Sequence, residues 1–183
     1  MYSKYELLLH NKTWTLEKLT ISTMPILSCK WVYRIKVQAD GSTHYKARLV
    51  LQGFEQVVHG ETFAIVAQPA TVYILLAVSA LENWHIHPID VTTAFLNPSI
   101  GDKVVYICPA EGIEWLDPGL YSQERSKVLR LRKGYYALEE APCLWCRDIA
   151  AYLHSIDFKS TMTDSNLNVS SAVILILNVD NVL

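Results

Sequence analysis

The chain of 183 residues lacks several features that would place it in a specialised class of protein. Its four cysteines are too few for a disulfide scaffold, which favours a reducing, intracellular setting, cytoplasmic or nuclear. It has no N-terminal signal-peptide pattern, and its apolar runs are far shorter than the ~20 residues of a membrane-spanning helix. No membrane partner is therefore expected. The net charge of −2 excludes a global attraction to nucleic acid, so any such role must rest on local patches.

Hydrophobic residues make up 51% of the chain, which is ample for a folded core. The clearest local pattern is "CKWVYRIKV" (29–37), followed by an Asp40-Gly41 turn signal and "HYKARLV" (44–50). Strict alternation in both segments predicts a β-hairpin with one apolar and one basic face. The predicted basic face carries Lys30, Arg34, Lys36, Lys46 and Arg48. These cations could hold nucleic-acid or nucleotide phosphates, or could simply form a solvated outer face.

The remaining pattern predicts an α+β fold with a mainly antiparallel sheet. The segment "ATVYILLAVSALEN" is apolar almost all round and is expected to form a buried helix. Pro142 is well placed in the first turn of a second, amphipathic helix. The expected elements after the hairpin are a helix over 70–83, strands over 84–91, 103–109 and 127–133, a helix from 142, and a strand over 171–179.

Two acidic residues stand at predicted strand ends. Asp90 closes the strand over 84–91, and Asp180 follows the last strand. Carboxylates of this kind, if they converge at one sheet edge, would suit Mg²⁺, which prefers oxygen ligands and keeps open positions for phosphate oxygens. Spacing alone favours the alternative of two separate surface turn residues.

Three further motifs admit a functional or a structural interpretation. A second basic cluster, with no acid over residues 125–138, could bind phosphates or face solvent. Cys143 and Cys146 form a CxxC in a helix's first turn, which suits a lowered thiol pKa but offers too few ligands for zinc. His85 and His87 form an HxH on a predicted strand without a recognisable third ligand.

Several stretches together resemble the reverse transcriptase domain of copia-type LTR retrotransposons. They occur in the family's order and with near-family spacing over nearly the whole chain. The matching stretches are "NKTWTLEKL", "CKWVYRIKVQADGSTHYKARLVLQGFEQ", "ETFAIVA", "HPIDVTTAFLN", "VLRLRKGYYALEEAPCLW" and "LILNVDNVL". The resemblance assigns function to Asp90, Asp180 and the basic hairpin, and none to the CxxC and HxH motifs.

The resemblance implies the right-hand polymerase fold, with fingers over residues 1–68 and a partial palm over 69–183. The implied reaction is templated addition of dNTPs to a primer, with Mg²⁺ or Mn²⁺ as cofactor and an RNA/DNA primer–template as partner. The chain would be part of a Pol polyprotein. The implied metal ligands are Asp90, the Val91 carbonyl and Asp180; Phe95 matches the steric gate that rejects ribose. Lys46 and Arg48 are expected to face the triphosphate, while Lys30, Arg34 and Lys36 would contact nucleic acid.

The sequence departs from the family at positions that matter for catalysis. Asn181 replaces the second aspartate of the family's Tyr-Val-Asp-Asp, so one anionic ligand is lost. Glu140 replaces a glutamine expected near the nucleotide, and Ala137 replaces a glycine, which is unfavourable if the backbone there needs a positive φ. We expect the catalytic hairpin to be cut off after its first strand, without a return strand.

These departures predict an impaired enzyme. The alternative is a non-enzymatic retrotransposon remnant that at most binds nucleic acid. If the family resemblance were coincidental, an unrelated α+β protein with a thiol function at Cys143 and Cys146 would remain.

Overall fold

The computed structural model describes residues 2–19, 25–56, 62, 64, 66–118, 127–178 and 181–182. The fold mixes helices with sheets that are mostly antiparallel, in agreement with the predicted α+β class. The chain forms two compact units, each built from two stretches of sequence. The first unit comprises Met1–Gly60 and Leu96–Ala141, and the second comprises Glu61–Phe95 and Pro142–Leu183. The division into fingers and palm at residue 68 remains a prediction.

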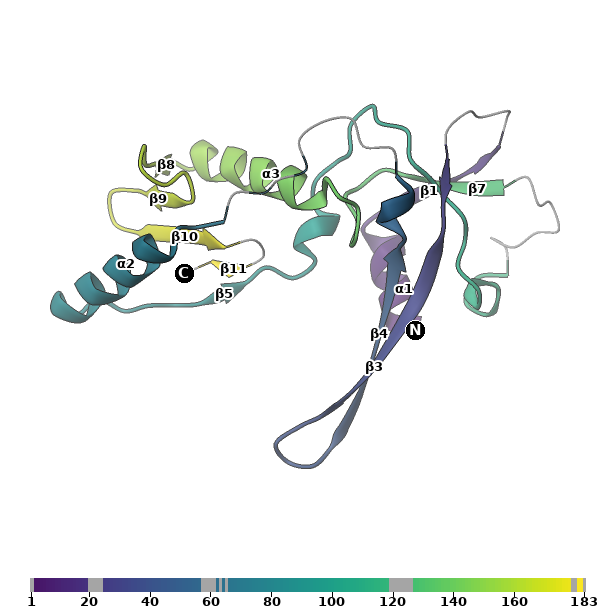
Figure 1. Cartoon of the computed structure of the whole chain (residues 1–183), viewed down its shortest axis with the longest axis horizontal. Coiled ribbons are helices and arrows are strands. Elements are labelled where there is room, and N and C mark those ends of the chain that lie inside the picture. Colours follow the sequence, from purple (N-terminus) through teal and green to yellow (C-terminus); the bar gives the residue numbers. More distant parts are fainter. Residues whose placement is uncertain are drawn as a thin grey trace. The chain divides into compact units, whose positions relative to one another are not determined.

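The first unit contains a four-stranded sheet and a separate long hairpin (Figure 1). Its elements are α1 (Tyr2–His10), β1 (Trp14–Lys18), β2 (Ile26–Leu27), β3 (Cys29–Val37), β4 (Thr43–Leu51), η1 (Gly53–Glu55), β6 (Tyr106–Ile107), η3 (Ile113–Trp115) and β7 (Lys127–Leu131). The sheet has the order β1-β7-β6-β2, with β2 parallel to β6 and the other pairs antiparallel. A further 3₁₀ helix, η2 (Ala94–Leu96), spans the sequence boundary between the two units.

Aromatic rings link α1 to the sheet and to the loop after β7. Successive ring centroids lie 6.2 Å apart from Tyr5 to Trp14 and 6.3 Å apart from Trp14 to Tyr135. All three residues are buried, and the Tyr135 hydroxyl donates a hydrogen bond to the Leu49 carbonyl oxygen of β4. This cluster ties the base of the hairpin to α1, an element for which the sequence pattern gave no prediction.

The hairpin of β3 and β4 has the predicted alternation. The register pairs Trp31 with Leu49 and Ile35 with Tyr45 on one face, and Arg34 with Lys46 on the other. Its turn at Asp40 is closed by hydrogen bonds that Ser42 donates to the Asp40 carboxylate. Most of its side chains are exposed, because each strand pairs only with the other in the described structure.

The second unit contains two helices and a five-stranded sheet (Figure 1). Its elements are α2 (Pro69–Leu81), β5 (Ile89–Asp90), α3 (Ala141–Ser155), β8 (Lys159–Ser160), β9 (Leu167–Val169), β10 (Ile174–Asn178) and β11 (Asn181–Val182). The sheet order is β5-β11-β10-β9-β8, with all pairs antiparallel. Leu153 of α3 and Leu177 of β10 form a core cluster, against which Val91 packs.

Asp164, which is buried, holds the start of α2. Its carboxylate accepts hydrogen bonds from the backbone N–H groups of Gln68 and Asn166. Burial opposes its charge, but these bonds and one from Thr71 prevail and lower the pKa of Asp164. The carboxylate thus satisfies one of the helix's otherwise unpaired N-terminal donors.

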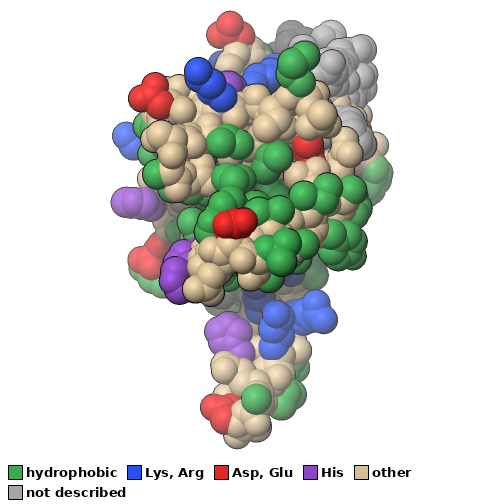
Figure 2. All heavy atoms as spheres, turned by 90° about the vertical axis from the view of Figure 1, so that its left-hand side faces the viewer, with side chains coloured by type: hydrophobic (Ala, Val, Ile, Leu, Met, Phe, Trp, Pro, Cys, Tyr) green, Lys and Arg blue, Asp and Glu red, His purple; other side chains and the backbone are tan. Residues whose placement is uncertain are grey.

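Three expectations about these elements were wrong. The helix α2 forms as predicted but is not buried: only Ser79 is, while Tyr73 and Leu81 are 70% and 83% exposed. Apolar side chains accordingly gather on the face of the second unit in Figure 2. An apolar composition shows only that a helix could be buried. The elements packed around the helix decide whether it is buried. The strands predicted over 84–91 and 103–109 shrink to two residues each.

The third correction concerns the end of the chain. The sequence analysis expects no return strand, yet β11 returns antiparallel to β10 and pairs Asn181 with Asn178. Two residues suffice because they add main-chain hydrogen bonds to strands on both sides. Among the described residues, no helix has the length and apolarity needed to cross a bilayer.

Candidate functional site

In the second unit, the backbone brings Asp90 to the predicted catalytic hairpin. Asp90 ends β5, and its register partner is Asn181 of β11, which in turn pairs with Asn178 of β10. The Asp90 side chain is exposed. Asp180, the other predicted acidic ligand, lies outside the described residues, so its meeting with Asp90 remains a prediction. The register nevertheless places Asp90 across from the residue that follows Asp180 in sequence.

The other residues predicted around Asp90 have different surroundings. Val91 follows Asp90 and packs against the core cluster of Leu153 and Leu177, which fixes the end of β5. Phe95 lies in η2 and is half-buried. Among the described residues, no group of three His, Cys, Asp or Glu side chains could hold a metal ion. The predicted metal site thus depends on Asp180.

In the first unit, the basic face of the hairpin has the composition that the sequence predicts. Cross-strand pairing places His44, opposite Lys36, on the same face as the five predicted cations. Neither strand contains an acidic residue, and none of these six side chains has an ion-pair partner within the described structure. Lys and Arg side chains lie along the hairpin in the lower part of Figure 2. Unopposed cations at this spacing suit the phosphates of a nucleotide or a nucleic-acid backbone.

Lys4 of α1 adds a further cation at the base of this face. The helix packs against β4, and the Lys4 ammonium lies 5.0 Å from the centroid of the Tyr136 ring. Partial burial, followed by the charges of Lys46 and Arg48, lowers the pKa of Lys4. The sequence analysis missed Lys4, because the helix that carries it has only a weak amphipathic pattern.

The loop that follows β7 passes beneath the hairpin. Ala137 has a φ of +69°, the left-handed conformation that favours glycine. This confirms the condition under which its replacement of a family glycine is unfavourable. Gly53 meets the same loop: a Cβ at position 53 would lie 1.9 Å from the Ala137 carbonyl oxygen. Only glycine at position 53 permits this approach without a shift of the backbone.

Glu140, predicted near the nucleotide, is only 4% exposed. Its carboxylate forms a salt bridge with Lys103. The pair neutralises the negative charge that Glu140 brings to the predicted nucleotide site.

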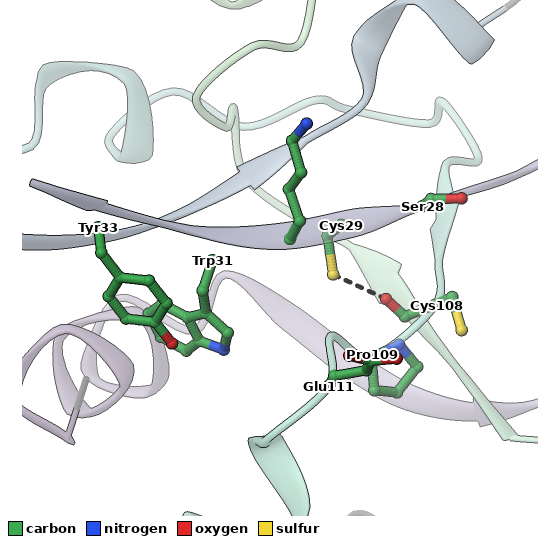
Figure 3. Close-up of a pocket in the computed structure, with 8 residues that line it drawn as sticks. Ser28, Cys29, Trp31, Tyr33, Cys108, Pro109 and Glu111 are labelled. Carbon is green, nitrogen blue, oxygen red and sulfur yellow. Dashed lines mark hydrogen bonds between the residues drawn. The ribbon is translucent and has the colours of Figure 1, made fainter.

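The apolar face of the hairpin borders a pocket of about 460 Å³ (Figure 3). Trp31, Tyr33 and Pro109 line it together with Cys29, whose thiol donates a hydrogen bond of 2.8 Å to the Cys108 carbonyl oxygen. Burial, followed by the neighbouring Cys108, raises the pKa of Cys29 to about 12. The Cys29 sulfur therefore stays protonated and is a poor nucleophile near neutral pH.

The remaining candidate motifs gain little support. In the second basic cluster, Arg130 and Arg132 contact the Glu17 carboxylate at 3.7 and 2.8 Å; Arg125 lies outside the described residues. Burial raises the pKa of Cys146, opposite to the lowered thiol pKa considered from sequence. His85 and His87 precede β5 and are not on a strand.

Comparison with known protein families shows the family to which the chain belongs. The profile of the reverse transcriptase (RNA-dependent DNA polymerase) family matches residues 11–183. The chain belongs to the reverse transcriptase family.

Its relatives are Pol polyproteins of copia-type transposons, as the resemblance predicts. The chain is 32% and 34% identical to the retrovirus-related Pol polyproteins from transposons RE2 and RE1 of Arabidopsis thaliana, over 94% of its length. It is 30% identical, over its whole length, to that from transposon TNT 1-94 of Nicotiana tabacum. The chain spans 12% of each Arabidopsis polyprotein and 14% of the tobacco one. No solved structure matches the chain.

Proposed function

We propose that this chain is the fingers (1–68) and partial palm (69–183) of a copia-type reverse transcriptase with impaired nucleotide addition. The observation that carries this proposal is the register of β5 and β11, which sets Asp90 opposite Asn181. In the family pattern an aspartate stands at position 181. This register supports a catalytic hairpin beside Asp90, in which one carboxylate of the proposed metal site is replaced by an amide.

The donor set fits a divalent cation only in part. Asp90, the Val91 carbonyl and Asp180 would hold Mg²⁺ or Mn²⁺, and Asn181 could offer only a neutral oxygen. When bound, the ions would neutralise charge on the reacting phosphate oxygens. Because the ion's affinity depends on anionic oxygens, we expect weak metal binding and slow turnover.

The substrates in this proposal are a dNTP and an RNA/DNA primer–template. Lys46 and Arg48 would contact the triphosphate, while Lys30, Arg34 and Lys36 would contact backbone phosphates. Phe95 would act as the steric gate against ribose. Glu140 belongs to the predicted nucleotide site, with its charge neutralised by Lys103. The remainder of a Pol polyprotein is the proposed covalent partner, and the cytoplasm or nucleus the proposed location.

A second candidate is a remnant that binds nucleic acid without catalysis. The observation that favours it is the basic face of six residues, which no carboxylate opposes among the described residues. Such binding requires neither Asp90 nor a metal ion. It should weaken steeply as salt increases, because phosphate contacts release counterions.

Primer extension separates the two candidates. The assay compares the unaltered chain with Asn181→Asp, in Mg²⁺ and in Mn²⁺, using Asp90→Ala as the inactive control. We expect Asn181→Asp to raise extension by about tenfold or more, because it restores an anionic metal ligand.

Equal extension by the unaltered chain and Asn181→Asp, well above the control, would show that catalysis is not impaired. The unaltered chain and Asn181→Asp could both extend the primer no more than Asp90→Ala does, while salt-sensitive binding of a primer–template persists. That result would support the second candidate, the remnant without catalysis. Absence of both extension and binding would refute both candidates.

A further inference from the structure

The described structure gives the charge of Lys4 no carboxylate partner. Lys4 lies on α1, which packs against β4, and it is half-buried at the base of the hairpin. It has no ion-pair partner among the described residues. A half-buried ammonium without a carboxylate is costly, because neighbouring cations and lost hydration both oppose its charge. An anionic ligand would remove this cost.

The geometry around Lys4 concentrates the positive charge. Lys46 and Arg48 are two residues apart on β4 and therefore lie on the same face of the hairpin. Burial, and after it the charges of Lys46 and Arg48, lowers the pKa of Lys4. The Tyr136 ring, at 5.0 Å, holds the ammonium by a cation–π contact, which positions Lys4 without neutralising it.

We propose that Lys4, Lys46 and Arg48 form one phosphate-binding site, in which Tyr136 positions the Lys4 ammonium. The inference rests on the proposed function and extends it to a residue of α1 that lies before the start of the family match at residue 11. The ligand is a phosphate group, carried by a nucleoside triphosphate or by a nucleic-acid backbone. Three donors of this kind would contact the several oxygens of one such group.

The experiment measures binding of two probes to the full chain: dTTP and a labelled primer–template duplex. Lys4→Met removes the charge but keeps an unbranched side chain, Lys4→Arg keeps the charge, and Lys18→Met is the matched control on β1. We expect Lys4→Met to weaken binding by roughly threefold to tenfold, as for one lost charge-assisted contact. Lys4→Arg should bind as well as the unaltered chain, because it keeps the charge. Lys18→Met should bind within about twofold of the unaltered chain. The probe that responds identifies the source of the phosphate.

An NMR titration of isotope-labelled lysines distinguishes phosphate binding by Lys4 from a merely structural role. Added tripolyphosphate should raise the pKa of Lys4, because a bound anion favours the charged form, while that of Lys18 stays unchanged. Melting temperatures check that each variant folds. Tyr136→Leu should weaken binding less than Lys4→Met does.

The outcomes distinguish this inference from the proposed function. If Lys46→Ala/Arg48→Ala weakens binding but Lys4→Met does not, the inference is wrong and the proposed function stands. If Lys4→Met weakens binding and the β4 double variant does not, a shared site is excluded. If neither weakens the binding of either probe, the shared site and the proposed phosphate contacts of Lys46 and Arg48 are both wrong, while primer extension still tests the proposed activity.

Discussion

Two strands of the first unit, β4 and β7, carry alternating basic residues but meet different surroundings. Arg130 of β7 and Arg132, which directly follows the strand, both contact Glu17 of the neighbouring strand β1. On β4, Lys46 and Arg48 have only a cation and an apolar residue, Arg34 and Val32, as their cross-strand partners. The same sequence pattern thus produces a neutralised strand in one place and an unopposed positive face in the other.

The difference arises from pairing rather than from composition. Because β7 is an inner strand, its pairing with β1 brings Glu17 within reach of Arg130 and of Arg132, which follows the strand. The hairpin strand β4 pairs only with β3, which has no acidic residue. Charge that a fold leaves unpaired is available to a ligand, whereas paired charge mainly supports the sheet.

The largest expected effect separates these two strands by their binding. We expect Lys46→Ala/Arg48→Ala to lower affinity for a primer–template by roughly tenfold to a hundredfold and to reduce the salt slope by about two, since each phosphate contact contributes to both. Fluorescence anisotropy at several salt concentrations measures this. The matched control, Arg130→Ala/Arg132→Ala, should bind within about twofold of the unaltered chain. An equal loss in the control would erase the distinction between β4 and β7.

A second prediction tests the support of the hairpin without changing any charge. Ala137→Gly should raise the free energy of unfolding by about 1 kcal/mol, because alanine is strained at a φ of +69° and glycine is not. Urea denaturation measures the change, and Ala39→Gly in the exposed hairpin turn is the control. A loss of stability in Ala137→Gly would contradict the strain inferred at this position.

The smallest expected effect concerns the paired strand. Glu17→Gln should lower the free energy of unfolding by about 0.5–1 kcal/mol, because it leaves Arg130 and Arg132 without their carboxylate partner at a partly exposed site. Thermal melts at low and high salt check this, and salt should reduce the difference. If Glu17→Gln also strengthens primer–template binding markedly, Arg130 and Arg132 can bind nucleic acid once their carboxylate partner is removed.

The parts of the fold that sequence predicts are those with strong periodicity. The hairpin, β7 and α3 follow from alternation or helical spacing, because each presents one apolar face to its surroundings. The burial of α2 could not be predicted, since its composition says nothing about which elements lie beside it. The two-residue strands could not be predicted from the sequence either, because such short pairings depend on the strands beside them.

The candidate site divides in the same way. Alternation placed the cations on one face of the hairpin, and the family resemblance chose Asp90. The register of β5 with β11 sets Asp90 opposite Asn181, and the catalytic role of Asp90 stays a prediction. Lys4 was missed, because its place beside Lys46 and Arg48 depends on the packing of α1 against β4. The pairing of Glu140 with Lys103 joins residues that share no sequence motif.

The position of β11 in its sheet bears on how the second unit is made. Within the described sheet, β5 reaches β10 only through β11. On a translating ribosome, β5 emerges long before its partner strand at residues 181–182. Such a distant pairing is entropically slow to form. β5 is therefore the last strand of this sheet to pair, and Asp90 reaches its position only when the sheet is complete.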